Sequence, residues 1–216
     1  MFFEYTFFDK ATFGLYRIAQ ILFGQFNLVF FIFCLIILLA GSNTSKSITC
    51  YIASLPLFIF VLSMLLKKMS ILDFDRYYTF DNNNFQIFIP IVFSFISFIA
   101  ILYSLYRIIN EDVPNGNLLN YVSIVFIMLG GIATQFIMGF APSLYESGDR
   151  TAIFLYFALI IVSLYVIILK KEHLLRPLQF GLPFLSFFSF VWTSRILIRA
   201  IFVDIESILL FIKQLL

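Results

Sequence analysis

Long apolar stretches separated by short polar breaks run along almost the whole chain. A helix that crosses a bilayer needs about 20 mostly apolar residues, and several uncharged stretches approach that length. They are Ile21–Ala40, Thr49–Leu66, Ile87–Tyr106, Leu118–Ala141, Thr151–Leu169 and Pro177–Ser194. Backbone groups in lipid must bond within their own segment, and the alternation typical of barrel strands is absent. The pattern therefore predicts an all-α fold, a polytopic integral membrane helical bundle with about six transmembrane helices.

The two ends of the chain differ from this central bundle, which is expected over residues 21–194. Residues 1–20 mix Phe and Tyr with acidic and basic side chains, a composition that suits an interfacial segment at the headgroups. Residues 195–216 carry Arg195, Arg199, Glu206 and Lys213 on one narrow helical face. This pattern predicts a C-terminal amphipathic helix that lies in the interface or continues from the last span. Since no cleavable signal peptide is visible, the first apolar run is expected to serve as an uncleaved anchor.

Composition supports the membrane class and narrows the chemistry. The 216 residues are 62% hydrophobic and 12% charged, against about 45–50% and 25% in soluble domains. A net charge of +2 gives no indication of nucleic-acid binding. His173 is the only histidine, so neither a structural zinc site nor a histidine-based triad is predicted. Cys34 and Cys50 lie in or beside apolar runs and are interpreted as packed thiols.

The segment between the fourth and fifth stretches is the most distinctive polar part of the chain. Pro142 ends one helix, Gly148 permits a left-handed turn, and Asp149 or Ser147 can cap the next helix. Arg150 then stands at the start of a span, where its guanidinium and the free backbone N–H groups suit a phosphate. The alternative is a short polar hairpin in which Arg150 pairs with a neighbouring carboxylate.

The same segment resembles a known family. The run FIMGFAPSLYESGDRTAIFLYFALIIVSLYVI is similar to a segment of glycosyltransferase-like polytopic membrane proteins from bacterial surface-polysaccharide clusters. The matching positions are Pro142, Tyr145, Ser147, Gly148 and Arg150. The resemblance implies a protein of the cell membrane that uses a polyprenyl-phosphate-linked sugar, with Arg150, Tyr145 and Gly148 binding the lipid phosphate.

The resemblance covers the C-terminal half only. Family members are usually longer and have catalytic acids in a loop after the first span. The corresponding loop here, Gly41–Ile48, has no acidic residue. The chain is therefore expected to be a truncated or split member, and a split member implies a partner membrane subunit.

Two acidic residues and two arginines complete the candidate site. Asp73 and Asp75 stand two positions apart, as in the D-x-D motif with which many glycosyltransferases hold a divalent metal. They are the candidate catalytic acids, and the alternative is an ordinary interfacial segment. Arg195 and Arg199 are candidate contacts for the lipid phosphate, and the alternative is snorkelling to headgroups. No cofactor is assigned.

The fourth stretch contains Gly130, Gly131, Gln135 and Gly139. Small residues allow helices to approach closely, and a glutamine in lipid needs a polar partner. Core packing is expected there, with a kink that lines a cavity as the alternative.

Three functions remain open from the sequence. An enzyme should place an acid and Arg150 on one side of the membrane, and alternating spans place the segments after the second and fourth stretches together. A transporter or flippase should have polar residues at mid-depth in several spans, and only Gln135 clearly meets that requirement. A structural membrane protein needs neither feature.

The expected topology predicts how reporter fusions will divide. Fusions at Ser45, Asn115 and Glu172 should all report one side of the membrane, and fusions at Asn83 and Gly148 should report the other. Activity of paired cytoplasmic and periplasmic reporters measures this. A split within either set would contradict the arrangement.

Overall fold

The computed structural model describes residues 6–24, 27–44, 46–69, 71–72, 88–112, 117–140, 152–170 and 174. The chain divides into two compact units, Met1–Leu174 and Leu175–Leu216, and all described residues belong to the first. Every regular element among them is helical. The order is α1 (Phe7–Ala19), η2 (Gln20–Gly24), α2 (Leu28–Ser42), α3 (Ser47–Lys68), α4 (Phe88–Asp112), α5 (Asn117–Met138) and α7 (Ile153–Leu169). The all-α prediction is confirmed for this part of the chain.

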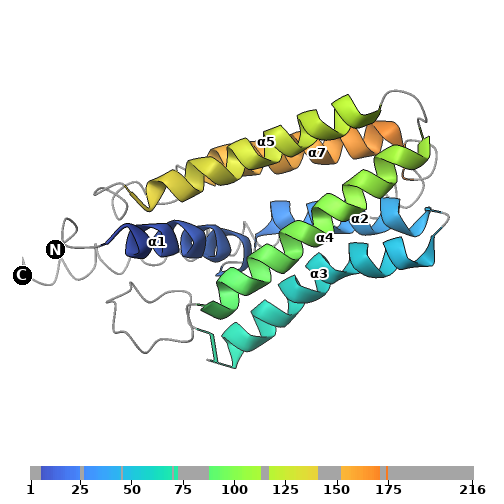
Figure 1. Ribbon diagram of the computed structural model, residues 1–216. Helices are drawn as coiled ribbons and strands as arrows, with labels where there is room; N and C mark the ends of the chain where they lie inside the picture. The colour runs from blue at the N-terminus through green and yellow to red at the C-terminus, as the bar shows by residue number, and fades with distance from the viewer. Residues whose placement is uncertain are drawn as a thin grey trace, which may run out of the picture. The chain divides into compact units, whose positions relative to one another are not determined.

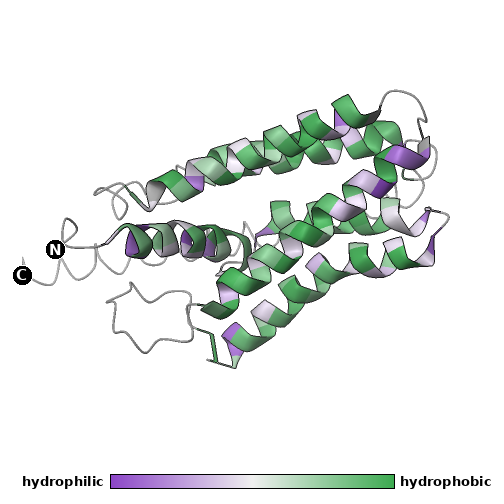
Figure 2. Ribbon diagram, viewed as in Figure 1, coloured by the Kyte–Doolittle hydropathy of each residue, from purple (hydrophilic) through white to green (hydrophobic). Residues whose placement is uncertain are grey.

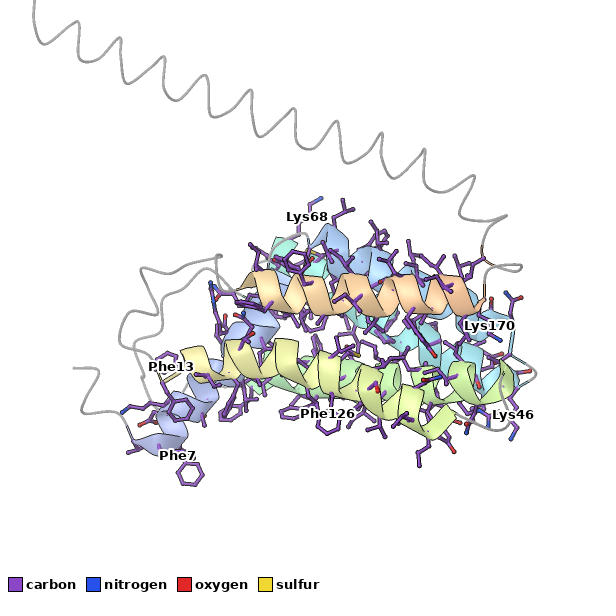
Figure 3. The ribbon with its side chains drawn as sticks, turned by 90° about the horizontal axis from the view of Figure 1, so that it is seen from above. Phe7, Phe13, Lys46, Lys68, Phe126 and Lys170 are labelled. Carbon is purple, nitrogen blue, oxygen red and sulfur yellow. The ribbon has the colours of Figure 1, made fainter. Side chains whose placement is uncertain are left out.

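Successive helices from α2 to α7 run antiparallel, so their ends gather in two groups (Figure 1). One group contains the end of α2, the start of α3, the end of α4, the start of α5 and the end of α7. Lys46 and Lys170 lie together at this end (Figure 3). The other group contains the end of α3, the start of α4, the end of α5 and the start of α7. This alternation is the one that the apolar pattern predicts.

Three helices are long and apolar enough to cross a membrane, namely α3, α4 and α5, and the number rises to four if α1 with η2 and α2 count as one bent span. α7 is equally apolar but has 17 residues. The chain is thus a helical membrane protein by length and composition. Six full spans are not confirmed, and the sixth predicted stretch, 177–194, lies outside the described residues, as does the predicted C-terminal helix.

The first predicted span, Ile21–Ala40, is not one continuous helix, because it contains most of η2 and most of α2 with a break between them. η2 ends at Gly24 and α2 starts at Leu28. The helical stretch Phe7–Gly24, which comprises α1 and η2, is bent by 79° relative to α2. Asn27 caps α2, because its side-chain oxygen accepts a hydrogen bond from the Phe30 amide at 3.0 Å. A capping asparagine satisfies a backbone donor that lipid would leave unpaired, so a new helix starts inside an apolar run.

α1 has polar and apolar faces, as expected of a segment at an interface. Thr6 and Asp9 form a reciprocal capping box at its start. Phe7 and Phe8 are exposed, whereas Gly14, Tyr16, Ile18 and Ala19 are buried. The buried face packs against α4 and α5. An interfacial position for residues 1–20 stays a prediction.

Small residues mark the close helix crossings. A Cβ atom on Gly14 would lie 2.4 Å from the carbonyl oxygen of Phe136, and one on Gly139 would lie 2.5 Å from the Gly14 nitrogen. Between α5 and α7, a Cβ on Gly131 would lie 2.8 Å from that of Ala158. The packing role expected for the glycines of the fourth stretch is therefore confirmed at Gly131 and Gly139. Gly130 has open space instead.

The outward faces are apolar and the interior is aromatic. Buried phenylalanines from three elements pack together, with ring centroids 5.5 Å apart for Phe23 and Phe30 and 5.9 Å apart for Phe30 and Phe60. Phe126, which is 70% exposed, points away from the bundle (Figure 3). Hydrophobic residues cover the middles of the helices, and polar residues gather at their ends (Figure 2). Exposed apolar side chains of this extent are typical of a lipid-facing surface.

The glycine contacts predict opposite results from the same substitution. Gly14→Ala should lower the free energy of unfolding by about 1–3 kcal/mol, because the added methyl group overlaps a backbone carbonyl. Gly130→Ala adds a methyl group to open space and should be neutral or raise stability by up to about 1 kcal/mol. Helicity followed during titration with SDS measures both. Equal effects at the two positions would contradict the crossing geometry.

Candidate functional site

The candidate site residues from the sequence lie outside the described residues. They are Asp73, Asp75, Tyr145, Gly148, Arg150, Arg195 and Arg199. Their assignments stay predictions. These residues belong to three segments: one with Asp73 and Asp75, one with Arg150, and one with Arg195 and Arg199. The structure describes the helix ends on both sides of the first two segments.

Those flanking helix ends lie at one end of the bundle. The end of α3 and the start of α4 border the segment with Asp73 and Asp75, and the end of α5 and the start of α7 border the segment with Arg150. All four ends belong to the same group (Figure 1). We refer to this end of the bundle below as the loop end.

Lys67 belongs to the loop end and stands directly after the second apolar stretch in the sequence, Thr49–Leu66. It is the second-to-last residue of α3, and its ammonium donates a hydrogen bond to the Gly24 carbonyl oxygen. Gly24 is the last residue of η2. The C-terminus of a helix carries partial negative charge on its free carbonyls, so a cation is favourable there. The sequence signal is a basic pair, Lys67 and Lys68, in the last turn of a span.

Asn27 satisfies the other side of the same helix break. Its side-chain nitrogen donates to the Ile21 carbonyl oxygen at 3.0 Å, while its side-chain oxygen caps α2. Asn27 is buried. The side chains of Asn27 and Lys67 thus each bond to a carbonyl oxygen of η2. Broken helices inside membrane proteins persist where their freed backbone groups find such partners.

A groove lies on the surface between α4 and α5, with α1 behind it. Its volume is about 190 Å³. Its walls are Leu15, Ile18, Ile91, Ser94, Phe95, Phe98, Leu129 and Ile132. Leu15 and Ile18 belong to α1. The other wall residues belong to the first half of α4 and the second half of α5, so the groove occupies the half of the bundle nearer the loop end.

A smaller cavity of about 40 Å³ adjoins the groove on its inner side. The two spaces share Ile18, Ser94, Phe98 and Ile132. The remaining walls of the inner cavity come from η2, α2, α4, α5 and α7. They are Leu22, Phe30, Ser97, Ile101, Met128, Leu155, Ala158 and Leu159. Ser94 and Ser97 are the polar residues that line either space.

Three of the four buried serines in the described helices bond to their own helix. Ser63 donates to the Phe60 carbonyl at 2.7 Å, Ser104 to the Ala100 carbonyl at 2.8 Å, and Ser163 to the Leu159 carbonyl at 2.7 Å. Such bonds satisfy a hydroxyl inside a helix without any partner from elsewhere. Gln135 is completely buried and has an interaction partner, as expected for a glutamine in lipid.

No family model, no curated protein and no solved structure matches this chain.

Within the described part of the chain, no cluster of His, Cys, Asp and Glu could hold a metal ion. Cys34 is buried, Cys50 is partly buried, and neither forms a disulfide, which confirms that the two thiols are unpaired. Within the described part of the chain, the features that could bind a ligand are therefore the apolar groove, its inner cavity, and the two lysines of the loop end, Lys67 and Lys68.

The lysine at the helix break should be more important for stability than its neighbour. Lys67→Met keeps the length of the side chain but loses the bond to the Gly24 carbonyl, so the free energy of unfolding should fall by about 1–2 kcal/mol. Lys68 is exposed, and Lys68→Met should change stability by less than about 0.5 kcal/mol. Titration with SDS compares the two variants. Equal losses would mean that Lys67 acts only as a surface charge.

Proposed function

We propose that this chain is a glycosyltransferase-like membrane protein of cell-envelope polysaccharide assembly. It sits in the cell membrane as a multi-pass protein and binds a polyprenyl-phosphate-linked sugar at the loop end. Arg150, with Tyr145 and Gly148, holds the lipid phosphate, and Arg195 and Arg199 contact lipid headgroups or the same phosphate. Asp73 or Asp75 acts as a base or a metal ligand.

One observation carries the proposal. The helix ends that border the acidic segment and the Arg150 segment lie in the same group (Figure 1). A lipid-linked sugar presents its phosphate and its sugar at one membrane surface, so an enzyme needs its anion-binding and acidic groups on that surface. Two antiparallel helices, α4 and α5, separate the acidic segment from the Arg150 segment, so the helix ends that border both segments lie at the same end of the bundle. This arrangement meets the requirement. The apolar outer faces of the bundle keep the lipid chain in the surrounding bilayer.

The cations of the described loop end add to this support. Lys67 and Lys68 end α3 at this surface, and Lys68 is exposed. Basic side chains next to a span attract anionic headgroups. A phosphate that approaches the loop end thus meets positive charge outside the predicted Arg150 site as well.

A transporter or flippase is the second candidate, and the helix break between η2 and α2 favours it. Discontinuous helices often form the substrate sites of transporters. The described bundle also gives evidence against transport, since Ser63, Ser104 and Ser163 bond to their own helices and the groove walls are almost entirely apolar. A polar solute would find few partners along these described faces.

The Arg150 series tests the proposal. Purified wild type in nanodiscs should bind a polyprenyl-phosphate analogue, and Arg150→Ala should bind it at least tenfold more weakly. Arg150→Lys should be nearly as weak, because lysine cannot present the planar pair of donors that matches phosphate oxygens. If Arg150 only forms an ion pair with a neighbouring carboxylate, lysine should substitute with a loss of about 1 kcal/mol or less.

Arg107 provides the control. It lies in the last turns of α4 at the opposite end of the bundle, where it pairs with Glu111 at 3.3 Å. Arg107→Lys should leave binding of the analogue unchanged. Equal binding by wild type and all variants, or binding by none of them, would refute the phosphate site.

A further inference from the structure

Three serines of α4 differ in how their hydroxyl groups are satisfied. Ser94 donates to the Pro90 carbonyl at 3.0 Å and Ser104 donates to the Ala100 carbonyl at 2.8 Å. Both bonds reach back one helical turn, the usual solution for a serine in an apolar environment. Ser97 lies between them, is only 1% exposed, and its Oγ atom has no hydrogen-bond partner within the described structure.

The unpaired Ser97 hydroxyl lines the inner cavity described above. That cavity is enclosed by apolar side chains such as Met128 and Leu159, and it adjoins the larger groove through Phe98 and Ile132. A buried hydroxyl without a partner costs free energy, and the cost disappears when a ligand supplies a donor or an acceptor. Ser94 also lines the inner cavity, but its hydroxyl is bonded within α4. Ser97 therefore supplies the unsatisfied hydroxyl of this apolar binding space.

The groove opens toward lipid between α4 and α5. Phe95 and Leu129 form its rim, and they are 49% and 43% exposed. A molecule dissolved in the bilayer can reach this rim without crossing water. The groove volume of about 190 Å³ exceeds the roughly 150 Å³ of an engineered protein cavity that binds benzene. A ring-sized apolar body fits this space.

We propose that the groove and the inner cavity form a binding site for a membrane-soluble molecule with a compact apolar body and one hydroxyl or carbonyl oxygen. The apolar body occupies the groove between α4 and α5, over Leu15 and Ile18 of α1. The oxygen reaches the inner cavity and bonds to Ser97 Oγ, which can both donate and accept. The site is distinct from the loop end, so it is independent of the proposed glycosyltransferase-like function.

Photolabelling tests this site with a matched pair of probes. One probe is a benzyl alcohol that carries a phenyl diazirine, and the other is the same molecule with a methyl group in place of the hydroxymethyl group. Full-length protein in nanodiscs is irradiated with each probe, and mass spectrometry locates the labelled residues. The alcohol should label Phe98, Met128 or Ile132 in a saturable way, and excess unlabelled benzyl alcohol should prevent this labelling.

The Ser97 variant decides the role of the hydroxyl. Ser97→Ala should weaken saturable binding of the alcohol about three- to tenfold, the loss expected for one hydrogen bond between uncharged groups. The methyl probe should bind wild type and Ser97→Ala equally. Ser104→Ala removes a serine that is two turns away and already satisfied by its own helix, so it should leave both probes unaffected. Because Ser97→Ala removes an unpaired hydroxyl, it should fold at least as well as wild type.

A second variant keeps the test independent of Ser97. Ile132→Trp fills the space shared by the groove and the inner cavity and should abolish saturable labelling by both probes. The proposal is refuted if the two probes label wild type equally, if Ser97→Ala has no effect on the alcohol, or if labelling never saturates. The last result would mean that only bulk lipid fills the groove.

Discussion

A helix that breaks inside an apolar bundle must find partners for the backbone groups that the break exposes. Between η2 and α2 the Asn27 side chain bonds to both sides of the break, and the Lys67 ammonium reaches the last carbonyl of η2 from α3. Water cannot substitute for these bonds in lipid. The direction in which α1 leaves the bundle therefore depends on two polar side chains.

The rest of the described architecture follows from that direction. Because α1 turns away from α2, Gly14 of α1 meets Phe136 of α5 and Gly139, the residue that follows this helix. The apolar residues Leu15 and Ile18 of α1 line the groove between α4 and α5. If η2 and α2 formed one straight helix, α1 would point in a different direction, and Leu15 and Ile18 would not line the groove between α4 and α5. The groove is thus a consequence of the break, and Asn27 and Lys67 influence a space to which neither side chain contributes.

α4 continues through Arg107 to Asp112, six residues past its predicted end at Tyr106. The sequence predicts α3, α5 and α7 to within three residues, because charged or turn-forming residues interrupt the apolar pattern at their ends. It fails between Gly24 and Leu28, where Asn27 is one polar residue in an apolar run and gives no periodic signal. Sequence also identifies the Gly130–Gly131 pair as small, but it cannot tell which glycine faces α7 and which faces open space. The sequence also cannot show that the Ser97 hydroxyl lacks a hydrogen-bond partner. That depends on how the hydroxyl is oriented toward a cavity formed by several helices.

The crossing of α1 and α5 has a consequence for the order in which the chain can assemble. Gly14 and Gly139 touch through their backbones, yet the ribosome makes α5 long after α1. During synthesis, the face of α1 that contains Gly14 therefore stays uncovered until α5 has been made. An amphipathic helix with charged residues and exposed phenylalanines can lie at the membrane surface until then, with its polar face toward the headgroups and its apolar face toward the acyl chains. The polar side of α1 thus suits the immature chain as well as the finished bundle.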